Sequence, residues 1–317
     1  MTRRLRVIRG WQDLPEGDRG AAVAMGNFDG VHRGHQKVIA LAAKAAGELG
    51  APLGVITLEP HPRVFHRPDE ASFRLMKPDQ QARALEALGV EVLYVLPYER
   101  ELAEMSDRDF ARRVLHEGLG VRHVAVGFDN SFGKDRTGTP LSMQQYGEEL
   151  GFGVSVAEPV ADAEGEKMSS TEVRDALRAG QPELAAEVLG RPFAIEGAVQ
   201  RGRQLGRKLG FPTANIALAD YVTPRFGVYA TRTRLPDGRE VPGVANIGVN
   251  PTVEGITIPL LEVWLFDFDE DIYDQVIETD LIAFLRPEAK FDSLEAMTAQ
   301  VMADAKAARD LLLPPLG

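Results

Sequence analysis

The stretch that decides the fold of the first half is residues 25–35, which read Met-Gly-Asn-Phe-Asp-Gly-Val-His-Arg-Gly-His. An apolar run at residues 21–25 predicts a strand before it, and the pattern at residues 36–49 predicts a helix after it. Such a turn exposes backbone N–H groups at the positive end of a helix dipole, which attracts anions. Because His32 and His35 are three residues apart, we expect both imidazoles on one helix face, where they can hold the charge of a phosphoryl group.

A His-x-x-His pair can also bind a metal ion, but zinc would need a third and a fourth ligand. The chain has no cysteine, and its other four histidines show no ligand spacing. The glycines and Asp29 lie where a tight turn needs them. The residues therefore favour a phosphate-binding turn over a metal site.

Composition limits the class of protein. The chain has 317 residues, enough for two domains, and its 44% hydrophobic and 26% charged residues are typical of a soluble globular protein. No run approaches the roughly 18 apolar residues of a membrane span, and the basic N-terminus lacks the apolar core of a signal peptide. The absence of cysteine excludes disulfides and fits the cytoplasm. A net charge of −11 disfavours non-specific binding to nucleic acid.

The first half of the chain alternates strand and helix patterns. The predicted strands are residues 21–25, 53–58, 92–96 and 123–127, and the predicted helices are residues 36–49, 78–88 and 108–117. This alternation predicts a parallel, doubly wound sheet, in which ligands bind at the carboxyl ends of the strands. Unusual residues follow three of those ends, at Met25, Leu58 and Gly127.

The pattern changes near residue 190. The predicted strands are then residues 193–200, 227–235, 241–247, 260–266 and 276–285, and no helical pattern appears before Ser293. A helix follows, with Ser293 or Asp292 as its cap. This succession predicts an antiparallel barrel closed off by one helix, and domains at residues 1–185 and 186–317.

Residues 25–35 resemble the nucleotide-binding signature of the cytidylyltransferase-like nucleotidyltransferases. In their longer form they resemble the prokaryotic bifunctional riboflavin kinase/FMN adenylyltransferase family, also called FAD synthetases. Residues 168–174 are similar to the family's Ile-Ser-Ser-Thr-x-x-Arg motif, with Met for Ile. Residues 57–62 are similar to Thr-Phe-Glu-Pro-His-Pro, with Leu58 for the aromatic residue. Residues 127–138 are similar to a glycine-rich family loop, in which Asn and Ser here replace Phe and Arg.

The most informative stretch of the second half is residues 202–215, which carry three glycines and three basic residues before Thr213 and Asn215. Their chemistry suits either a phosphate cradle or a basic surface hairpin. Thr213 and Asn215 are two apart on an extended segment and point the same way, as a pair of oxygen ligands for Mg²⁺ would. The string resembles the riboflavin kinase signature Gly-Arg-x-Leu-Gly-Phe-Pro-Thr-Ala-Asn.

Residues 261–269 resemble the segment that carries the catalytic glutamate of the riboflavin kinases, which corresponds to Glu262. Leu261 and Val263 lie on the other strand face, so the carboxylate can act as a general base beside a ribityl chain. Downstream, Glu270 and Asp274 replace two family glycines, and either would be strained if its φ must be positive.

The resemblance implies a Rossmann-like nucleotidyltransferase domain followed by a riboflavin kinase barrel with a C-terminal helix. It implies phosphorylation of riboflavin to FMN by ATP and adenylylation of FMN to FAD with release of pyrophosphate, with Mg²⁺ as cofactor. The residues expected in catalysis are His32, His35, Arg174 and Glu262. Those expected to bind ATP or its phosphates are Gly26, Asn27, Asp29, Gly34, Ser169, Ser170, Thr171, Gly206, Arg207, Gly210, Thr213 and Asn215, the last two also as metal ligands. Those expected at the flavin are Leu58, Asp129, Phe132 and Arg136.

Two alternatives remain open from the residues. One is a nucleotidyltransferase for another acceptor, with a non-catalytic flavin-binding barrel. The other is a flavin-binding or regulatory protein with both sites degenerate. The expected partners are the small molecules ATP, riboflavin and FMN, without nucleic acid or membrane, for a cytoplasmic monomer or weak homo-oligomer.

Overall fold

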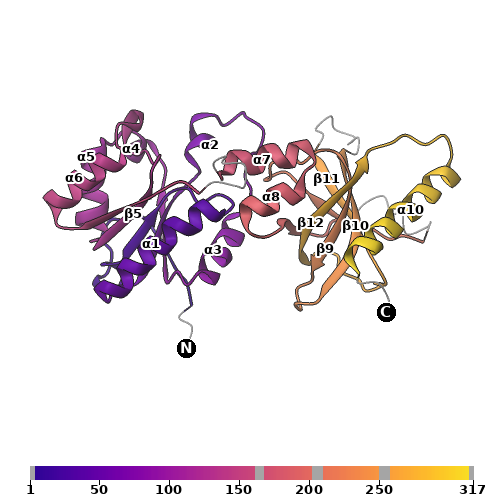
Figure 1. The fold of residues 1–317 in the computed structure, drawn as a ribbon, viewed down its shortest axis with the longest axis horizontal. Coiled ribbons are helices and arrows are strands. Elements are labelled where there is room, and N and C mark those ends of the chain that lie inside the picture. The colour runs from indigo at the N-terminus through magenta and orange to yellow at the C-terminus, as the bar shows by residue number, and fades with distance from the viewer. Residues whose placement is uncertain (1–3, 161–167, 202–209, 250–257, 314–317) are drawn as a thin grey trace. The chain divides into compact units, whose positions relative to one another are not determined.

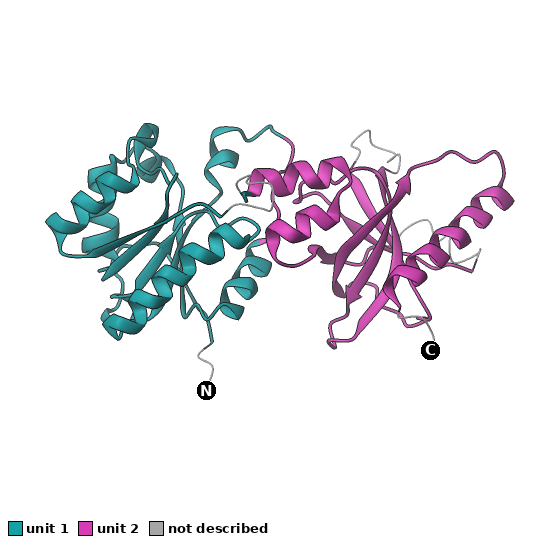
Figure 2. Ribbon diagram, in the orientation of Figure 1, with its two compact units in different colours: residues 1–70, 78–169 teal, residues 71–77, 170–317 magenta. Residues whose placement is uncertain are grey.

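The computed structural model describes residues 4–160, 168–201, 210–249 and 258–313 (Figure 1). These residues form two compact units, which are described separately (Figure 2). Unit 1 consists of residues 1–70 and 78–169, and unit 2 consists of residues 71–77 and 170–317.

Unit 1 is built on a parallel six-stranded sheet in the order β1-β4-β3-β2-β5-β6. The strands are β1 (Arg6–Arg9), β2 (Ala22–Met25), β3 (Leu53–Glu59), β4 (Val92–Pro97), β5 (His123–Gly127) and β6 (Gly153–Ala157). The prediction of a parallel doubly wound sheet is confirmed, and β1 and β6 extend it at its two edges.

Helices cover both faces of this sheet (Figure 1). They are α1 (Arg33–Leu49), α2 (Pro62–His66), α3 (Pro78–Ala87), α4 (Arg100–Ala103), α5 (Asp107–Asp109), the π-helical η2 (Phe110–Gly118) and α6 (Pro140–Leu150), with short 3₁₀ turns η1 (Glu16–Asp18) and η3 (Lys134–Arg136). The predicted helix at residues 78–88 matches α3, and that at residues 108–117 is formed by α5 and η2 together.

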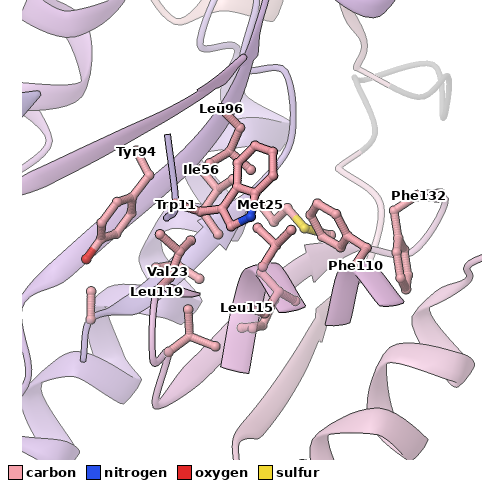
Figure 3. Close-up of a cluster of buried hydrophobic side chains, with 14 of the residues drawn as sticks. Trp11, Val23, Met25, Ile56, Tyr94, Leu96, Phe110, Leu115, Leu119 and Phe132 are labelled. Carbon is pink, nitrogen blue, oxygen red and sulfur yellow. The ribbon is translucent and has the colours of Figure 1, made fainter. Parts of the chain in front are cut away.

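The core of unit 1 lies between the central strands and η2 (Figure 3). Val23 and Ile56 project from β2 and β3 toward Leu115 and Leu119, and all four side chains are at most 1% exposed. Each such side chain stabilises the fold by about 1.5–3 kcal/mol relative to exposure. Tyr94 is also fully buried, and its hydroxyl is satisfied because it donates to the Asp18 carbonyl at 2.7 Å. The core therefore holds the sheet rigid beneath its carboxyl edge.

Unit 2 contains an antiparallel six-stranded sheet in the order β7-β12-β9-β10-β11-β8. The strands are β7 (Phe193–Ala198), β8 (Ala214–Ala217), β9 (Gly227–Arg234), β10 (Glu240–Val249), β11 (Pro259–Leu265) and β12 (Val276–Pro287). The Gln200 N–H donates to the Asn215 carbonyl at 2.8 Å, which joins the two edge strands into a nearly closed barrel. Helix α10 (Leu294–Leu312) packs on it and is capped by the Ser293 hydroxyl, which accepts from the Ala296 N–H. The predicted barrel and its single closing helix are confirmed.

Two further helices and a distant piece of chain belong to unit 2. The helices are α7 (Ser170–Ala179) and α8 (Pro182–Leu189). The distant piece is residues 71–77, where the Arg74 carbonyl accepts from the Val222 N–H at 2.8 Å. Lys77 also pairs with Asp220 at 3.8 Å. Unit 2 therefore takes its residues from two separate parts of the sequence.

One carboxylate on β12 makes barrel stability depend on pH. Burial, with the nearby Glu278 carboxylate, raises the pKa of Asp280 from 3.8 to about 6, although Arg234 and Arg191 oppose the shift. Between those two values the folded chain holds a proton that the unfolded chain has released, so stability is lost as pH rises through about 6. We expect Asp280→Asn to stabilise the protein by about 1–2 kcal/mol at neutral pH. Thermal unfolding midpoints at pH 5 and 7.5 check this, and an equal gain at both pH values would contradict it.

Candidate functional site

A strained turn follows β2 at the carboxyl edge of the parallel sheet. Phe28 and Val31 adopt left-handed φ values of 51° and 45°, and both side chains are 1% exposed. Each such non-glycine residue costs about 1–3 kcal/mol and persists only where its surroundings hold it. The turn also buries the predicted ATP residue Asp29, which is 7% exposed. Strain of this kind is typical of a preorganised ligand site.

The two histidines of the turn lie face to face. Their ring centroids are 3.6 Å apart with an interplanar angle of 26°. The rings of Phe28 and His35 pack in a T-shaped arrangement, with centroids 5.1 Å apart. Helix α1 begins at Arg33, so His32 lies just outside the helix, although the two imidazoles do come together as predicted. His32 precedes the helix as its N-cap, where its Nδ1 accepts from the His35 N–H at 3.4 Å. The capping interaction, rather than helical spacing, brings the two rings together.

Gly34 is the residue that makes room for this stack. A Cβ at Gly34 would lie 2.9 Å from Cε1 of His32 and 3.3 Å from the Met168 carbonyl oxygen. Both distances are shorter than ordinary van der Waals contact. A side chain at this position would therefore push the His32 ring out of its stack.

For the adenylyl transfer that the sequence resemblance predicts, we expect Gly34→Ala to lower the rate by about tenfold or more, because a displaced imidazole would no longer meet the phosphates. Gly47→Ala on the same helix is the matched control, since a Cβ there meets no atom within 4 Å. Alanine should stabilise α1 at Gly47 by up to about 1 kcal/mol. Steady-state rates and melting curves of both variants check this, and equal rates would contradict it.

Side chains from three other parts of unit 1 hold the turn, and the sequence pattern did not reveal them. Gln81 Nε2 on α3 donates to the Asn27 carbonyl at 2.8 Å, and Thr57 Oγ1 on β3 donates to the same oxygen at 3.2 Å. Gln36 Nε2 on α1 donates to the Val31 carbonyl at 3.0 Å. Thr57 belongs to the motif at residues 57–62, but no local sequence pattern identifies Gln81 or Gln36.

The predicted flavin residues of the loop after β5 lie in different environments. Asp129 and Arg136 are exposed, and Arg136 Nε donates to Ser131 Oγ at 2.8 Å. Phe132 is 9% exposed and packs in the core, with its ring over Gly138 and 5.8 Å from the Phe110 ring. These roles stay predictions.

Other hydrogen bonds attach this loop to β2 and to Asp107. Asn130 Nδ2 donates to the Met25 carbonyl at 3.4 Å, which brings the loop beside the end of β2. Asp107 accepts from Tyr146 Oη at 2.8 Å and from Thr137 Oγ1 at 3.2 Å. Leu58, the last predicted flavin residue, is partly buried against the core of unit 1.

The predicted phosphate clamp lies where α7 begins. Ser169 ends unit 1, and Ser170, Thr171 and Arg174 belong to unit 2. Arg174 is 8% exposed, its Nε donates to the Phe73 carbonyl at 2.7 Å, and its guanidinium lies 5.1 Å from the Phe73 ring centre. A clamp on the nucleotide phosphates stays a prediction for these residues.

Among the described residues of the barrel, Thr213 lines two cavities. The first cavity has a volume of about 230 Å³ and a mixed lining. Its residues include Thr213, Asn215, Phe268, Asp269 and Tyr273. The second cavity has a volume of about 340 Å³ and a largely apolar lining. Its residues include Phe211, Glu262, Trp264, Met297 and Val301.

Glu262 lies at the centre of a polar row across three strands. It is paired in register with Asn215 on β8 and with Asn246 on β10, so the three side chains share one face of the sheet. Leu261 and Val263 are fully buried on the opposite face, as the alternation predicts. This arrangement presents the Glu262 carboxylate to the second cavity, which Thr213 also lines.

A partly buried ion pair joins two elements that line the second cavity. Arg286 on β12 contacts Asp304 on α10 through two nitrogens, Nη2 at 2.7 Å and Nε at 2.9 Å. Asp304 is 7% exposed and also accepts from Gln300 Nε2 at 2.9 Å. The pair fixes α10, and with it Met297 and Val301, across the cavity.

Other sequence predictions for the barrel have mixed outcomes. Gly206 and Arg207 lie outside the described residues. Gly210 is left-handed, with φ of 89°. Asp274 has φ of 63°, so the expected strain is present there, whereas Glu270 is not left-handed and binds Arg239 at 2.7 and 2.8 Å.

Comparisons with known proteins find a known family for each half of the chain. The FAD synthetase family model matches residues 14–172, and the riboflavin kinase family model matches residues 189–312. A bifunctional riboflavin kinase/FMN adenylyltransferase from Pseudomonas fluorescens is 43% identical over 310 residues, which are 98% of this chain and 99% of that protein. The protein of the same description from Escherichia coli K12 is 37% identical over 307 residues, with coverage of 96% and 97%.

A solved structure is also similar over the whole chain. It comes from Streptococcus pneumoniae and is described as a macrolide-efflux protein, with a TM-score of 0.84 and 29% identity. The match covers 97% of this chain and 99% of that one. In the part of the present chain that the structure describes, every helix is too short or too polar to cross a membrane.

Proposed function

Since this chain belongs to the family of bifunctional riboflavin kinase/FMN adenylyltransferases, we propose that it makes FAD from riboflavin in two ATP-dependent steps. The observation that carries the proposal is the presence, in one polypeptide, of both matched domains with a distinct site in each. Unit 1 offers a strained anion-binding turn with two stacked imidazoles. The barrel offers two cavities that share Thr213 in their linings, and the Glu262 carboxylate lines the second.

In the kinase step, riboflavin occupies the second cavity and ATP the first. The aromatic rings of Phe211 and Trp264 suit the flat isoalloxazine ring. Glu262 takes the proton from the 5′-hydroxyl as that oxygen bonds to the γ-phosphorus of ATP and ADP leaves. Thr213 lines both cavities, which supports a role for it between the two substrates in this proposal.

Thr213 and Asn215 are also the proposed ligands of Mg²⁺. Asn215 Nδ2 donates to the Thr213 carbonyl at 3.4 Å, so the amide oxygen is the end that is free to face an ion. A hydroxyl and an amide oxygen are the hard ligands that Mg²⁺ accepts. The ion would neutralise charge on the transferred phosphoryl group.

In the adenylylation step, a phosphate oxygen of FMN bonds to the α-phosphorus of ATP and pyrophosphate leaves. No covalent enzyme intermediate is needed, so catalysis consists of positioning and charge stabilisation. His32 and His35 donate to the developing charge, together with backbone N–H groups of the turn and the start of α1. Arg174, Ser169, Ser170 and Thr171 grip the outer phosphates in this proposal.

Several finer features belong to the same proposal. The flavin of FMN contacts Leu58, Asp129, Phe132 and Arg136. The functional domains divide at residues 185/186. The protein is cytoplasmic, is a monomer or weak homo-oligomer, and binds small molecules rather than nucleic acid, in keeping with its net charge of −11.

One incubation tests the whole proposal. The full chain is mixed with riboflavin, ATP and Mg²⁺, and the flavins are separated by chromatography. FMN and FAD should both form. FMN alone would mean that unit 1 does not adenylate FMN and would favour another acceptor, whereas unchanged riboflavin would refute the kinase assignment. A parallel incubation with FMN and ATP tests the second step alone.

A further inference from the structure

The Asn27 carbonyl oxygen is held by two side chains at once. Gln81 Nε2 approaches it to 2.8 Å and Thr57 Oγ1 to 3.2 Å. Gln81 is partly buried and Thr57 is 4% exposed. A carbonyl oxygen has two lone pairs, and both are used here by donors from different elements, α3 and β3. Two donors on one oxygen fix the direction of that carbonyl more firmly than one would.

Fixing this carbonyl also fixes an N–H group. The Asn27–Phe28 peptide is planar and trans, so its N–H points opposite to its C=O. Within the described residues, the Phe28 N–H has no hydrogen-bond acceptor. The hydrogen bonds from Gln81 and Thr57 therefore direct an N–H group away from β3 and α3, at the turn that also holds the stacked histidines.

The two hydrogen bonds to the Asn27 carbonyl lie next to the strained part of the backbone. Phe28 immediately follows the clamped carbonyl and has a φ of 51°. At the other end of the turn, Gln36 holds the carbonyl of Val31, whose φ is 45°. A strained backbone relaxes when its restraints are removed, and the N–H groups then lose their orientation.

We propose that Gln81, together with Thr57, is a positioning residue for adenylyl transfer, which aims the Phe28 N–H at the phosphates of bound ATP. The proposal rests on the proposed function of unit 1. Gln81 acts through the backbone of the turn and does not itself touch the reacting atoms. Gln81 lies outside every sequence motif described above, and Thr57 lies in one of them without an assigned role.

The test compares variants of the full chain that lose or keep one donor. Gln81→Leu and Thr57→Val remove a donor with little change of volume, whereas Thr57→Ser keeps its hydroxyl. Gln144→Leu, at an exposed position of α6, is the matched control for a glutamine-to-leucine change on a helix. The readouts are kcat and KM for FMN and for ATP in adenylylation, the riboflavin kinase rate of the same sample, and the melting curve.

We expect Gln81→Leu to lower the adenylylation kcat by about tenfold, because a misaimed donor no longer meets the transition state. Combining Gln81→Leu with Thr57→Val should cost more than the product of the single effects, since each donor partly covers the loss of the other. The KM for FMN, the kinase rate and the melting midpoint should stay near those of the unaltered chain. Thr57→Ser and Gln144→Leu should be indistinguishable from it.

Two results would overturn the proposal. One is an unchanged adenylylation kcat in the double variant. The other is a loss that appears equally in the kinase rate and the melting midpoint, since that would show a general loss of folding. Failure of the proposed function is seen separately, because the unaltered chain would then form no FAD from FMN and ATP.

Discussion

Glu262→Ala should stop the formation of FMN while the conversion of FMN to FAD continues. A general base contributes about 10²–10⁴-fold to a rate, so the kinase rate should fall by about that factor. Glu262 lies in the barrel, in register with Asn215 and Asn246, and lines the second cavity. The residues proposed for adenylylation at the turn belong to unit 1.

The kinase experiment needs a variant that separates chemistry from shape. Glu262→Gln keeps the size of the side chain but cannot take a proton, so it should be as inactive as Glu262→Ala. Glu240→Gln is the matched control, since Glu240 is an exposed strand glutamate whose ion pair with Arg234 contributes little. Chromatography of flavins from riboflavin, and separately from FMN, reads out both steps. Loss of both activities in a folded variant would refute the independence of the two sites.

Replacement of either stacked histidine should remove adenylylation and spare the kinase. Loss of one preorganised donor to a developing oxyanion costs about 10²–10³ in kcat, and we expect that factor for His35→Ala. His32→Ala should show the same loss and a lower melting midpoint as well, because an N-cap residue contributes about 0.5–2 kcal/mol. The kinase rate should not change, and a kinase defect of equal size would contradict the assignment.

His32→Asn distinguishes the two roles of this residue. Asparagine is a strong N-cap, so its side-chain oxygen can accept from the His35 N–H in place of the imidazole. The melting midpoint should therefore recover while adenylylation remains lost. If His32→Asn restored adenylylation, the imidazole of His32 would be only a cap and the proposed charge stabilisation would rest on His35.

Local patterns predicted most of the fold because they report burial directly. The apolar run at residues 123–127 became β5, whose Val124, Ala125 and Val126 are fully buried. The position before an amphipathic run predicts Ser293 or Asp292 as a cap, and the Ser293 hydroxyl makes that hydrogen bond. Such features depend on residues within a few positions of each other, so the sequence contains the necessary information.

The site was less predictable where it depends on distant residues or on the direction of a ring. Gln81 is 54 residues from the carbonyl that it binds, and its own surroundings read as an ordinary helix. Phe132 is predicted at the flavin, but its burial over Gly138, which has no side chain, depends on a residue six positions away that its own motif position does not reveal. Of two acids that replace family glycines, only Asp274 is left-handed, and composition cannot tell it from Glu270.

Residues 71–77 belong to unit 2 although they lie within the sequence of unit 1, and this limits where the chain can be divided into fragments. A fragment that begins at residue 186 keeps all six barrel strands but leaves behind the Arg74 carbonyl that holds Val222, the lysine that pairs with Asp220, and Met76, whose sulfur contacts Arg191. Without these contacts, the excised barrel would expose the surface around Tyr221, which is 1% exposed in the intact chain. Proteolysis or gene truncation at one point therefore cannot separate the two compact units intact, because residues 71–77 of unit 2 lie within the sequence of unit 1.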